Sequence, residues 1–190
     1  MKYLRVILLS LAATFVLSAH ASQSFDISSY ASVTAPNVLG WDLYEVKENS
    51  VQFSNQLPEP PFYASFLTAR VITIDPAKDR VEYILESVGK RLSRFSYNEA
   101  KSELLINFNY KRINHLGADC VSIEWITKYP REERNNVPPT FTNQRMIECP
   151  VPNTASEIVS LSFSSFGKET SIPAFRREVA EVFFNSLKFK

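Results

Sequence analysis

The stretch CVSIEWITKY, residues 120–129, alternates apolar and polar side chains as a half-buried β-strand does. One face carries Val121, Ile123 and Trp125, and the other carries Ser122, Glu124 and Lys128. The stretch TFTNQRMIEC, residues 140–149, has a similar composition and follows the charged, proline-containing segment PREERNNVPP. The two stretches predict neighbouring antiparallel strands, and each of them holds one of the chain's two cysteines.

Placing Cys120 opposite Cys149 gives this hairpin a definite register. The pairs it creates are Glu124 with Arg145, Ile123 with Met146, Tyr129 with Thr140, and Val121 with Glu148. The first is an opposite-charge pair and the second is an apolar pair, and both kinds of cross-strand pair favour a register. The last pair is a mismatch, because it sets a carboxylate against an apolar side chain.

The N-terminus, MKYLRVILLSLAATFVLSAHAS, has the three parts of a secretory signal peptide. Lys2 and Arg5 precede an apolar run at 6–17, and the small-residue sequence AHA at 19–21 is typical of a cleavage site. We expect residues 1–21 to be removed after Ala21. The apolar run is shorter than the roughly 20 residues that span a bilayer, so we expect a soluble, extracytoplasmic protein. The alternative is an uncleaved N-terminal anchor.

The two cysteines predict one structural disulfide, because thiols in even number pair in an oxidising compartment. Closing a loop of about 30 residues stabilises a fold by roughly 3–4 kcal/mol. The alternative makes Cys120 a nucleophile activated by His115, but no third group that would orient the histidine is apparent. Redox exchange is disfavoured because the cysteines are not in a C-x-x-C arrangement. We therefore expect a Cys120–Cys149 bond.

Composition argues against several classes of function. Without its first 21 residues the chain keeps 169, enough for one domain, with 19 basic and 20 acidic side chains. This balance gives no reason to expect nucleic acid or an anionic membrane as partner. We interpret the basic clusters KRLSR, at 90–94, and PREER, at 130–134, as solvated surface.

Side chains that serve metal, nucleotide or hydrolase chemistry are scarce. After His20 leaves with the signal, His115 is the single histidine, which excludes a His-rich catalytic zinc site. The four glycines lie too far apart for a dinucleotide, P-loop or nucleophile-elbow motif. The acidic pairs Glu132 with Glu133 and Glu178 with Glu181 are interpreted as solvated. We expect no cofactor and no metal.

The rest of the chain predicts further strands and two helices. Residues 22–39 are Ser-rich and predict a tail or an edge strand. We expect strands at 41–46, 51–54, 64–74, 103–113 and 158–166, the first two joined by the turn KENS. Residues 96–115 also suit a helix in their first part, so a short helical turn is expected before the strand at 103–113.

The two expected helices each have an apolar stripe. The first covers 76–92, with Asp75 as its cap and Pro76 at its first position. Its stripe is Val81, Ile84, Leu85, Val88 and Leu92. The second begins near SIPAFRREV, with the stripe Phe175, Val179, Val182 and Phe183. Consecutive strands between widely spaced helices predict one α+β domain over 40–190, with a mostly antiparallel sheet flanked by helices.

Four C-terminal stretches resemble a pattern found in uncharacterised secreted bacterial proteins: CVSIEWITKYP, MIECPVP, IVSLSFSSFGKE and FRREVAEVFFNSLKFK. The positions that carry this resemblance are Cys120, Cys149, Pro150, Ser164 and the SLKF at 186–189. More distantly, the start GW…VQF and the closing helix with SLKF look like PsbP-like domains. This resemblance implies an α/β/α sandwich around an antiparallel sheet. It also implies a protein partner, because PsbP-like domains mostly bind or assemble with other proteins.

The function we favour is an extracytoplasmic, non-catalytic binding or accessory domain. The segment LPEPPFY, at 57–63, would present Phe62 and Tyr63 as contact anchors. The alternative for these two side chains is that they pack onto the domain. The alternative function is a secreted enzyme, which would need a cleft with titratable groups of shifted pKa, or an effector acting on a host.

Overall fold

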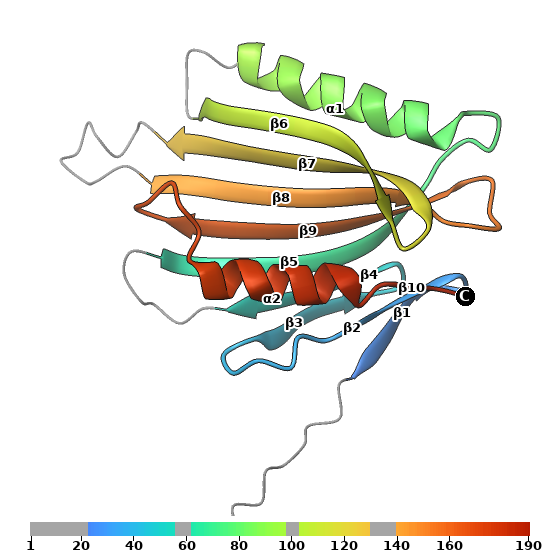
Figure 1. The fold of residues 1–190 in the computed structure, drawn as a ribbon, viewed down its shortest axis with the longest axis horizontal. Helices are drawn as coiled ribbons and strands as arrows, with labels where there is room; N and C mark the ends of the chain where they lie inside the picture. Colours follow the sequence, from blue (N-terminus) through green and yellow to red (C-terminus); the bar gives the residue numbers. More distant parts are fainter. Residues whose placement is uncertain (1–22, 56–61, 98–102, 130–139) are drawn as a thin grey trace, which may run out of the picture.

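The computed structural model describes residues 23–55, 62–97, 103–129 and 140–190. At its centre is a seven-stranded sheet of order β3-β4-β5-β9-β8-β7-β6, in which each neighbouring pair is antiparallel (Figure 1). The strands are β3 (Asp42–Lys47), β4 (Ser50–Asn55), β5 (Phe62–Thr73), β6 (Leu104–His115), β7 (Ala118–Tyr129), β8 (Thr140–Pro150) and β9 (Glu157–Gly167). This sheet and its two flanking helices confirm the predicted α+β class.

The hairpin of β7 and β8 has the register predicted from the sequence. Glu124 lies opposite Arg145, and Val121 lies opposite Glu148. A disulfide joins Cys120 to Cys149 over a separation of 29 residues. The apparent mismatch at Glu148 has a physical reason, since its carboxylate forms an ion pair of 2.8 Å with Arg91 of the helix above it.

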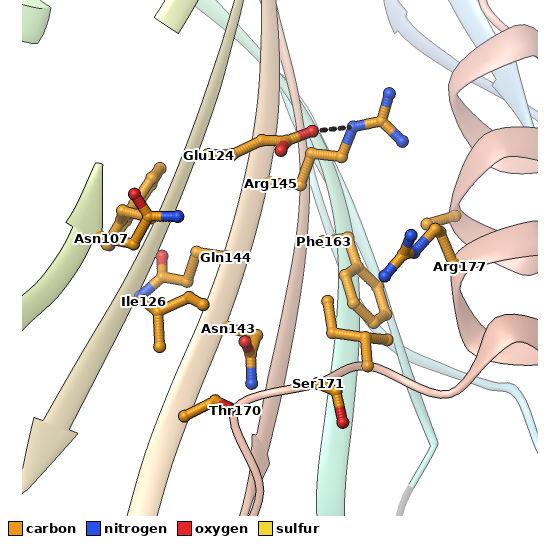
Figure 2. Close-up of a pocket in the computed structure, with 13 residues that line it drawn as sticks. Asn107, Glu124, Ile126, Asn143, Gln144, Arg145, Phe163, Thr170, Ser171 and Arg177 are labelled. Carbon is orange, nitrogen blue, oxygen red and sulfur yellow. Dashed lines mark ion pairs between the residues drawn. The ribbon is translucent and has the colours of Figure 1, made fainter. Parts of the chain in front are cut away.

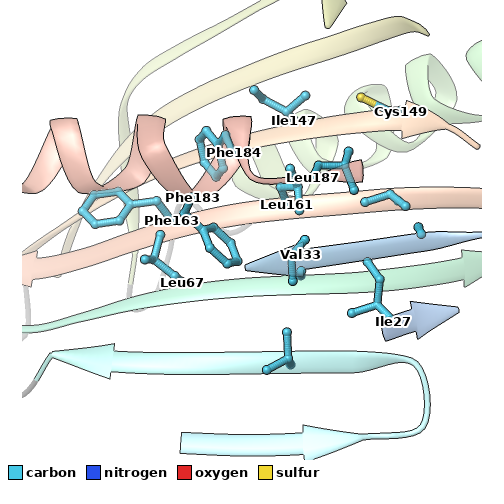
Figure 3. Close-up of a cluster of buried hydrophobic side chains, with 14 of the residues drawn as sticks. Ile27, Val33, Leu67, Ile147, Cys149, Leu161, Phe163, Phe183, Phe184 and Leu187 are labelled. Carbon is cyan, nitrogen blue, oxygen red and sulfur yellow. The ribbon is translucent and has the colours of Figure 1, made fainter. Parts of the chain in front are cut away.

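One face of the sheet, the α2 side, is covered by helix α2 (Ala174–Asn185) and by a small three-stranded sheet of order β1-β2-β10. The small sheet contains β1 (Ser24–Ser28), β2 (Ala31–Thr34) and β10 (Lys188–Phe189), so it joins the N-terminal hairpin to the SLKF segment. Its apolar side chains pack with those of α2 onto the sheet (Figure 3). This cluster includes Ile27, Val33, Leu67, Ile147, Leu161, Phe163, Phe183, Phe184 and Leu187, with the disulfide beside them.

The opposite face, the α1 side, is covered over β7 and β8 by helix α1 (Arg80–Tyr97). The buried apolar cluster here is Ile74, Ile84, Val88, Val121, Ile123, Trp125, Met146 and Ile158. Because both faces are covered, β7 is more buried than the predicted half-buried strand, and Ser122 on its expected polar face is only 3% exposed. Within the described ranges, no helix is long and apolar enough to cross a membrane.

The predicted start of α1 is wrong by four residues. Asp75 and Pro76 form a turn, in which the Asp75 carbonyl accepts from the Lys78 N–H at 3.0 Å. The residue that caps the helix is Asp79, whose carboxylate accepts from the Glu82 N–H at 2.8 Å. A helix starting at Pro76 would need the Asp75 carbonyl for its first intrahelical hydrogen bond, and the turn already uses this carbonyl. At the other end α1 runs to Tyr97, and the helical turn expected after it falls at 98–102, outside the described residues.

The predicted buried stripe of α2 is also wrong in part. Phe175 is 53% exposed and Val182 is 61% exposed. The buried side chains are Arg176, Val179, Ala180, Phe183 and Phe184. The helix is rotated towards Phe184, and this brings the Arg176 guanidinium against the Ser65 hydroxyl of β5 at 2.5 Å. Burying a second phenylalanine therefore also buries a charged side chain that has a hydrogen-bond partner.

Candidate binding site

A pocket of about 200 Å³ opens on the α2 side, between β7, β8 and the segment that joins β9 to α2 (Figure 2). Its apolar lining includes Ile126, Phe163, Ile172 and Ala180, and its polar lining includes Asn107, Asn143, Gln144, Thr170, Ser171 and Arg177. The side chains come from β6, β7, β8, β9, the segment after β9, and α2. The sheet, the connecting segment and α2 thus each supply both apolar and polar side chains to the pocket.

The position of the connecting segment is fixed by a hydrogen bond from the sheet. The Asn143 side-chain amide donates to the Glu169 carbonyl at 3.3 Å, and Asn143 itself is buried. This bond joins the middle of the sheet to the residues just before Thr170 and Ser171. The hydroxyls of those two residues are therefore presented at the pocket by an anchored segment.

Arg145 ties three elements together beside the pocket. Its Nε lies 3.1 Å from the Glu124 carboxylate on β7, and its Nη1 forms an ion pair with Glu181 on α2. The guanidinium also lies over the Phe184 ring, 5.4 Å from the centroid. Two carboxylates and an aromatic face hold this cation, so Arg145 serves to position α2 on the sheet.

Arg177 differs from Arg145 in having no such partner. Among the residues that the structure describes, its side chain forms no ion pair or hydrogen bond. Figure 2 shows its guanidinium reaching from α2 towards Phe163 at the cavity. The pocket therefore combines an apolar floor with a cation that is available to a ligand.

Tyr129, near the end of β7, is a titratable side chain whose pKa is shifted. Burial raises the pKa of its phenol, and the nearby Glu103 carboxylate raises it further. The Tyr129 hydroxyl donates to Glu103 at 3.2 Å. A raised pKa keeps the phenol protonated at neutral pH, which is the opposite of what a nucleophile or a general base requires.

The cysteine and histidine singled out from the sequence are placed as structural groups. Both cysteines are fully buried, and their sulfurs are bonded to each other, so Cys120 offers no thiol for the alternative nucleophilic role. His115 donates from Nε2 to the Phe184 carbonyl at 3.1 Å, which ties the β6–β7 turn to the end of α2. Across the described residues, no group of three His, Cys, Asp or Glu side chains is arranged to hold a metal.

The structure describes only some of the other residues considered in the sequence, namely the expected contact residues and the two acidic pairs. Phe62 and Tyr63 begin β5, but their side chains and all of residues 57–61 lie outside what the structure describes, so the contact-loop hypothesis stays a prediction. Glu132 and Glu133 also lie outside them. Of the pair on α2, Glu181 is engaged by Arg145. The pocket residues were not predicted, because the sequence FRREV indicates only that Arg177 lies on the polar face of a helix, and Arg177 belongs to no recognised motif.

Comparison with known proteins identifies the architecture. No family model matches the chain, and no curated protein matches it significantly. The solution structure of cyanobacterial PsbP from Synechocystis sp. PCC 6803 superposes with a TM-score of 0.54 at 14% identity, covering 95% of this chain and 99% of that one. The fold is PsbP-like. At this identity the match shows the architecture and not an activity, and it confirms the fold implied by the sequence resemblance.

Two further structures are similar to this PsbP-like fold at lower scores. LpqN, involved in cell envelope biogenesis of Mycobacterium tuberculosis, has a TM-score of 0.46 at 12% identity, covering 90% of this chain and 87% of that one. The Ran-binding protein Mog1p of Saccharomyces cerevisiae has a TM-score of 0.45 at 8% identity, covering 88% and 95%. Both scores fall below 0.5, so the PsbP-like assignment rests on the cyanobacterial protein.

Proposed function

We propose that this protein is an extracytoplasmic, non-catalytic binding domain, and that its pocket takes a carboxylate-bearing side chain of a protein partner. The observation that carries this proposal is Arg177, a cation without a partner among the described residues, set beside a small cavity with an apolar floor. A guanidinium presents paired N–H donors that match a carboxylate in geometry as well as in charge.

The size of the pocket favours part of a protein over a free cofactor. At about 200 Å³ it is smaller than the roughly 300–1,000 Å³ typical of small-molecule sites. One or two side chains fill such a volume. The exposed Asn107 amide and Ser171 hydroxyl lie at the same pocket and can hydrogen-bond the backbone on either side of an inserted acidic residue.

Two features support a location outside the cytoplasm. The N-terminal residues have the composition of a signal peptide with a cleavage site at Ala21. The Cys120–Cys149 disulfide is of the kind that persists in oxidising compartments. A PsbP-like sheet with an external pocket fits an accessory role, in which the domain recognises another protein and does no chemistry on it.

Site-directed photo-crosslinking in the source cells tests the proposal. A photoreactive amino acid at Ser171 should give one discrete crosslinked protein, and Arg177→Glu should weaken that product at least about tenfold, because it puts two carboxylates in contact. Ser93, an exposed serine on α1, is the matched crosslinking control, and Lys90→Glu is the matched charge control. Equal products from positions 93 and 171, or a product that Arg177→Glu leaves unchanged, would overturn the proposal.

A further inference from the structure

β3 is an edge strand with an unusual amount of exposed apolar surface. It ends the seven-stranded sheet, and within the described ranges it pairs with β4 alone. All six of its residues are exposed, including Leu43 at 49%, Tyr44 at 59% and Val46 at 56%. The outer edge of such a strand offers unpaired backbone donors and acceptors to another strand.

A β-bulge makes the order in which the side chains of β3 face the two sides of the sheet symmetric about the centre of the strand. Leu43 lies opposite Phe53, and Val46 lies opposite Val51, and both partners belong to the apolar cluster of the α2 side. The three charged residues lie opposite the alternate positions of β4: Asp42 opposite Ser54, Glu45 opposite Gln52, and Lys47 opposite Ser50. These three side chains therefore belong to the other face of the sheet.

Tyr44 is the residue at the bulge, between Leu43 and Glu45. Its ring contacts that of Phe66 with 6.0 Å between centroids, and Phe66 lies opposite Ser54. Tyr44 thus shares the face of the charged residues. From residue 42 to residue 47, successive side chains face the α1 side, the α2 side, the α1 side, the α1 side, the α2 side and the α1 side of the sheet. This order is the same when it is followed from either end of the strand.

That symmetry makes β3 complementary to itself. Directly opposite residues of antiparallel strands lie on the same face. In a regular six-residue strand, a two-fold axis through its centre would set residues of opposite faces against each other, and the bulge removes this conflict. The pairs across the axis are then Asp42 with Lys47, Leu43 with Val46, and Tyr44 with Glu45, each formed twice.

We propose that β3 pairs antiparallel with β3 of a second copy of this chain, so that the central sheet continues across a two-fold axis. Two ion pairs and two apolar pairs favour this register over its neighbours. Six residues from each chain bury less than the roughly 1,000 Å² of a stable interface, so the dimer is weak and depends on concentration. The pocket at Arg177 is a separate feature, and neither proposal depends on the other.

Sedimentation velocity of the mature protein, from about 10 µM to about 1 mM, should show a reversible monomer–dimer equilibrium. Asp42→Lys creates two Lys–Lys contacts and should raise the dimer dissociation constant about tenfold. The double variant Asp42→Lys/Lys47→Asp restores both intermolecular ion pairs with their signs exchanged. It also removes the 2.9 Å ion pair between Lys47 and Glu45 within each strand, so it should restore most of the dimer. Glu48→Lys, in the turn beyond β3, makes the same change in net charge outside the pairing and should have no effect.

Hydrogen exchange gives a second readout that needs no variant. Amides of β3 should exchange more slowly as the protein concentration rises, whereas those of β6, the other edge of the sheet, should not. The proposal is overturned by a protein that is monomeric at 1 mM, by a charge swap that fails to restore association, or by concentration-dependent protection at β6 and not at β3.

Discussion

The α2 side of the sheet is covered by a helix and a small sheet over a large apolar cluster, whereas the α1 side is covered by one helix over a smaller apolar cluster and a partly buried ion pair. On the α2 side, Phe183 and Phe184 have no exposed surface, and residues of the N-terminal hairpin share their cluster. On the α1 side, the Glu148 carboxylate is 2% exposed and meets Arg91. Both sides bury an apolar cluster, the larger one on the α2 side, and the α1 side has in addition a buried carboxylate that needs its cation, so the two should respond differently to mutation.

Arg91 has several partners under α1. Besides Glu148, it contacts the Met146 sulfur at 2.9 Å and lies over the Trp125 ring, 5.9 Å from its centroid. Ser160 donates to the same Glu148 carboxylate at 3.3 Å. The ion pair therefore sits on apolar side chains with a second hydrogen bond in place, which is the arrangement that makes a partly buried charge tolerable.

The largest effect should come from truncating the α2-side core. Phe183→Ala removes a ring that is fully buried and whose centroid lies 5.8 Å from that of the Phe53 ring. We expect a loss of about 3–5 kcal/mol in the free energy of unfolding, measured by urea denaturation. Ile84→Ala under α1 is the counterpart and should cost about 2–3 kcal/mol, because a single helix can settle onto the sheet. A larger loss from Ile84→Ala would reverse the ranking of the two sides.

The disulfide should contribute nearly as much to the free energy of unfolding, because it restricts the conformations of the unfolded chain. Replacing both Cys120 and Cys149 with alanine removes a cross-link over 29 residues and should cost roughly 3–4 kcal/mol. The near-ultraviolet circular dichroism spectrum of the folded protein should be retained, because cross-strand pairs also hold the β7–β8 register. A loss below about 1 kcal/mol would show that the bond adds little to the hairpin.

The ion pair under α1 should give an asymmetric result. Arg91→Met leaves the buried Glu148 carboxylate without its cation and should cost about 2–3 kcal/mol, less than a fully buried pair because Arg91 is 20% exposed. Glu148→Gln keeps an acceptor for Ser160 and leaves an arginine that can reach water, so it should cost about 1 kcal/mol. Equal costs in urea denaturation would contradict the view that the carboxylate is the group that needs its partner.

The smallest effect should appear at high pH. The raised pKa of Tyr129 means that the folded protein holds the phenolic proton more tightly than the unfolded chain, whose value is 10.0. Its contribution to stability is thus complete below pH 10 and is lost as the pH rises above it. Tyr129→Phe should lose less stability than the wild type between pH 9 and pH 11, measured by urea denaturation. Parallel losses would show that the phenol is not involved.

The features that the sequence predicted depend on local, period-two patterns. The β7–β8 register followed from placing Cys120 opposite Cys149 in two alternating strands, and the structure has the Glu124–Arg145 and Ile123–Met146 pairs that this placement created. Strand identity needs only alternation and nearby turns, so β3, β4, β5, β8 and β9 could all be located to within a few residues.

The features that it missed depend on distant partners. Adjacent Phe183 and Phe184 allow the stripe of α2 to be drawn through Phe175 and Val182 or through Arg176 and Ala180. The structure buries Phe184 and with it Arg176, whose guanidinium donates to the Ser65 hydroxyl, 111 residues away along the chain. The pocket was missed for the same reason, since it assembles Asn107, Asn143 and Arg177 from three separate elements.

The most direct test of an extracytoplasmic binding domain is the intact mass, with a free-thiol count, of the protein purified from its source cells. We expect a chain of 169 residues that begins at Ser22, with both cysteines oxidised. A mass that includes the first 21 residues together with two free thiols would contradict export and would remove the basis for seeking the partner outside the cytoplasm.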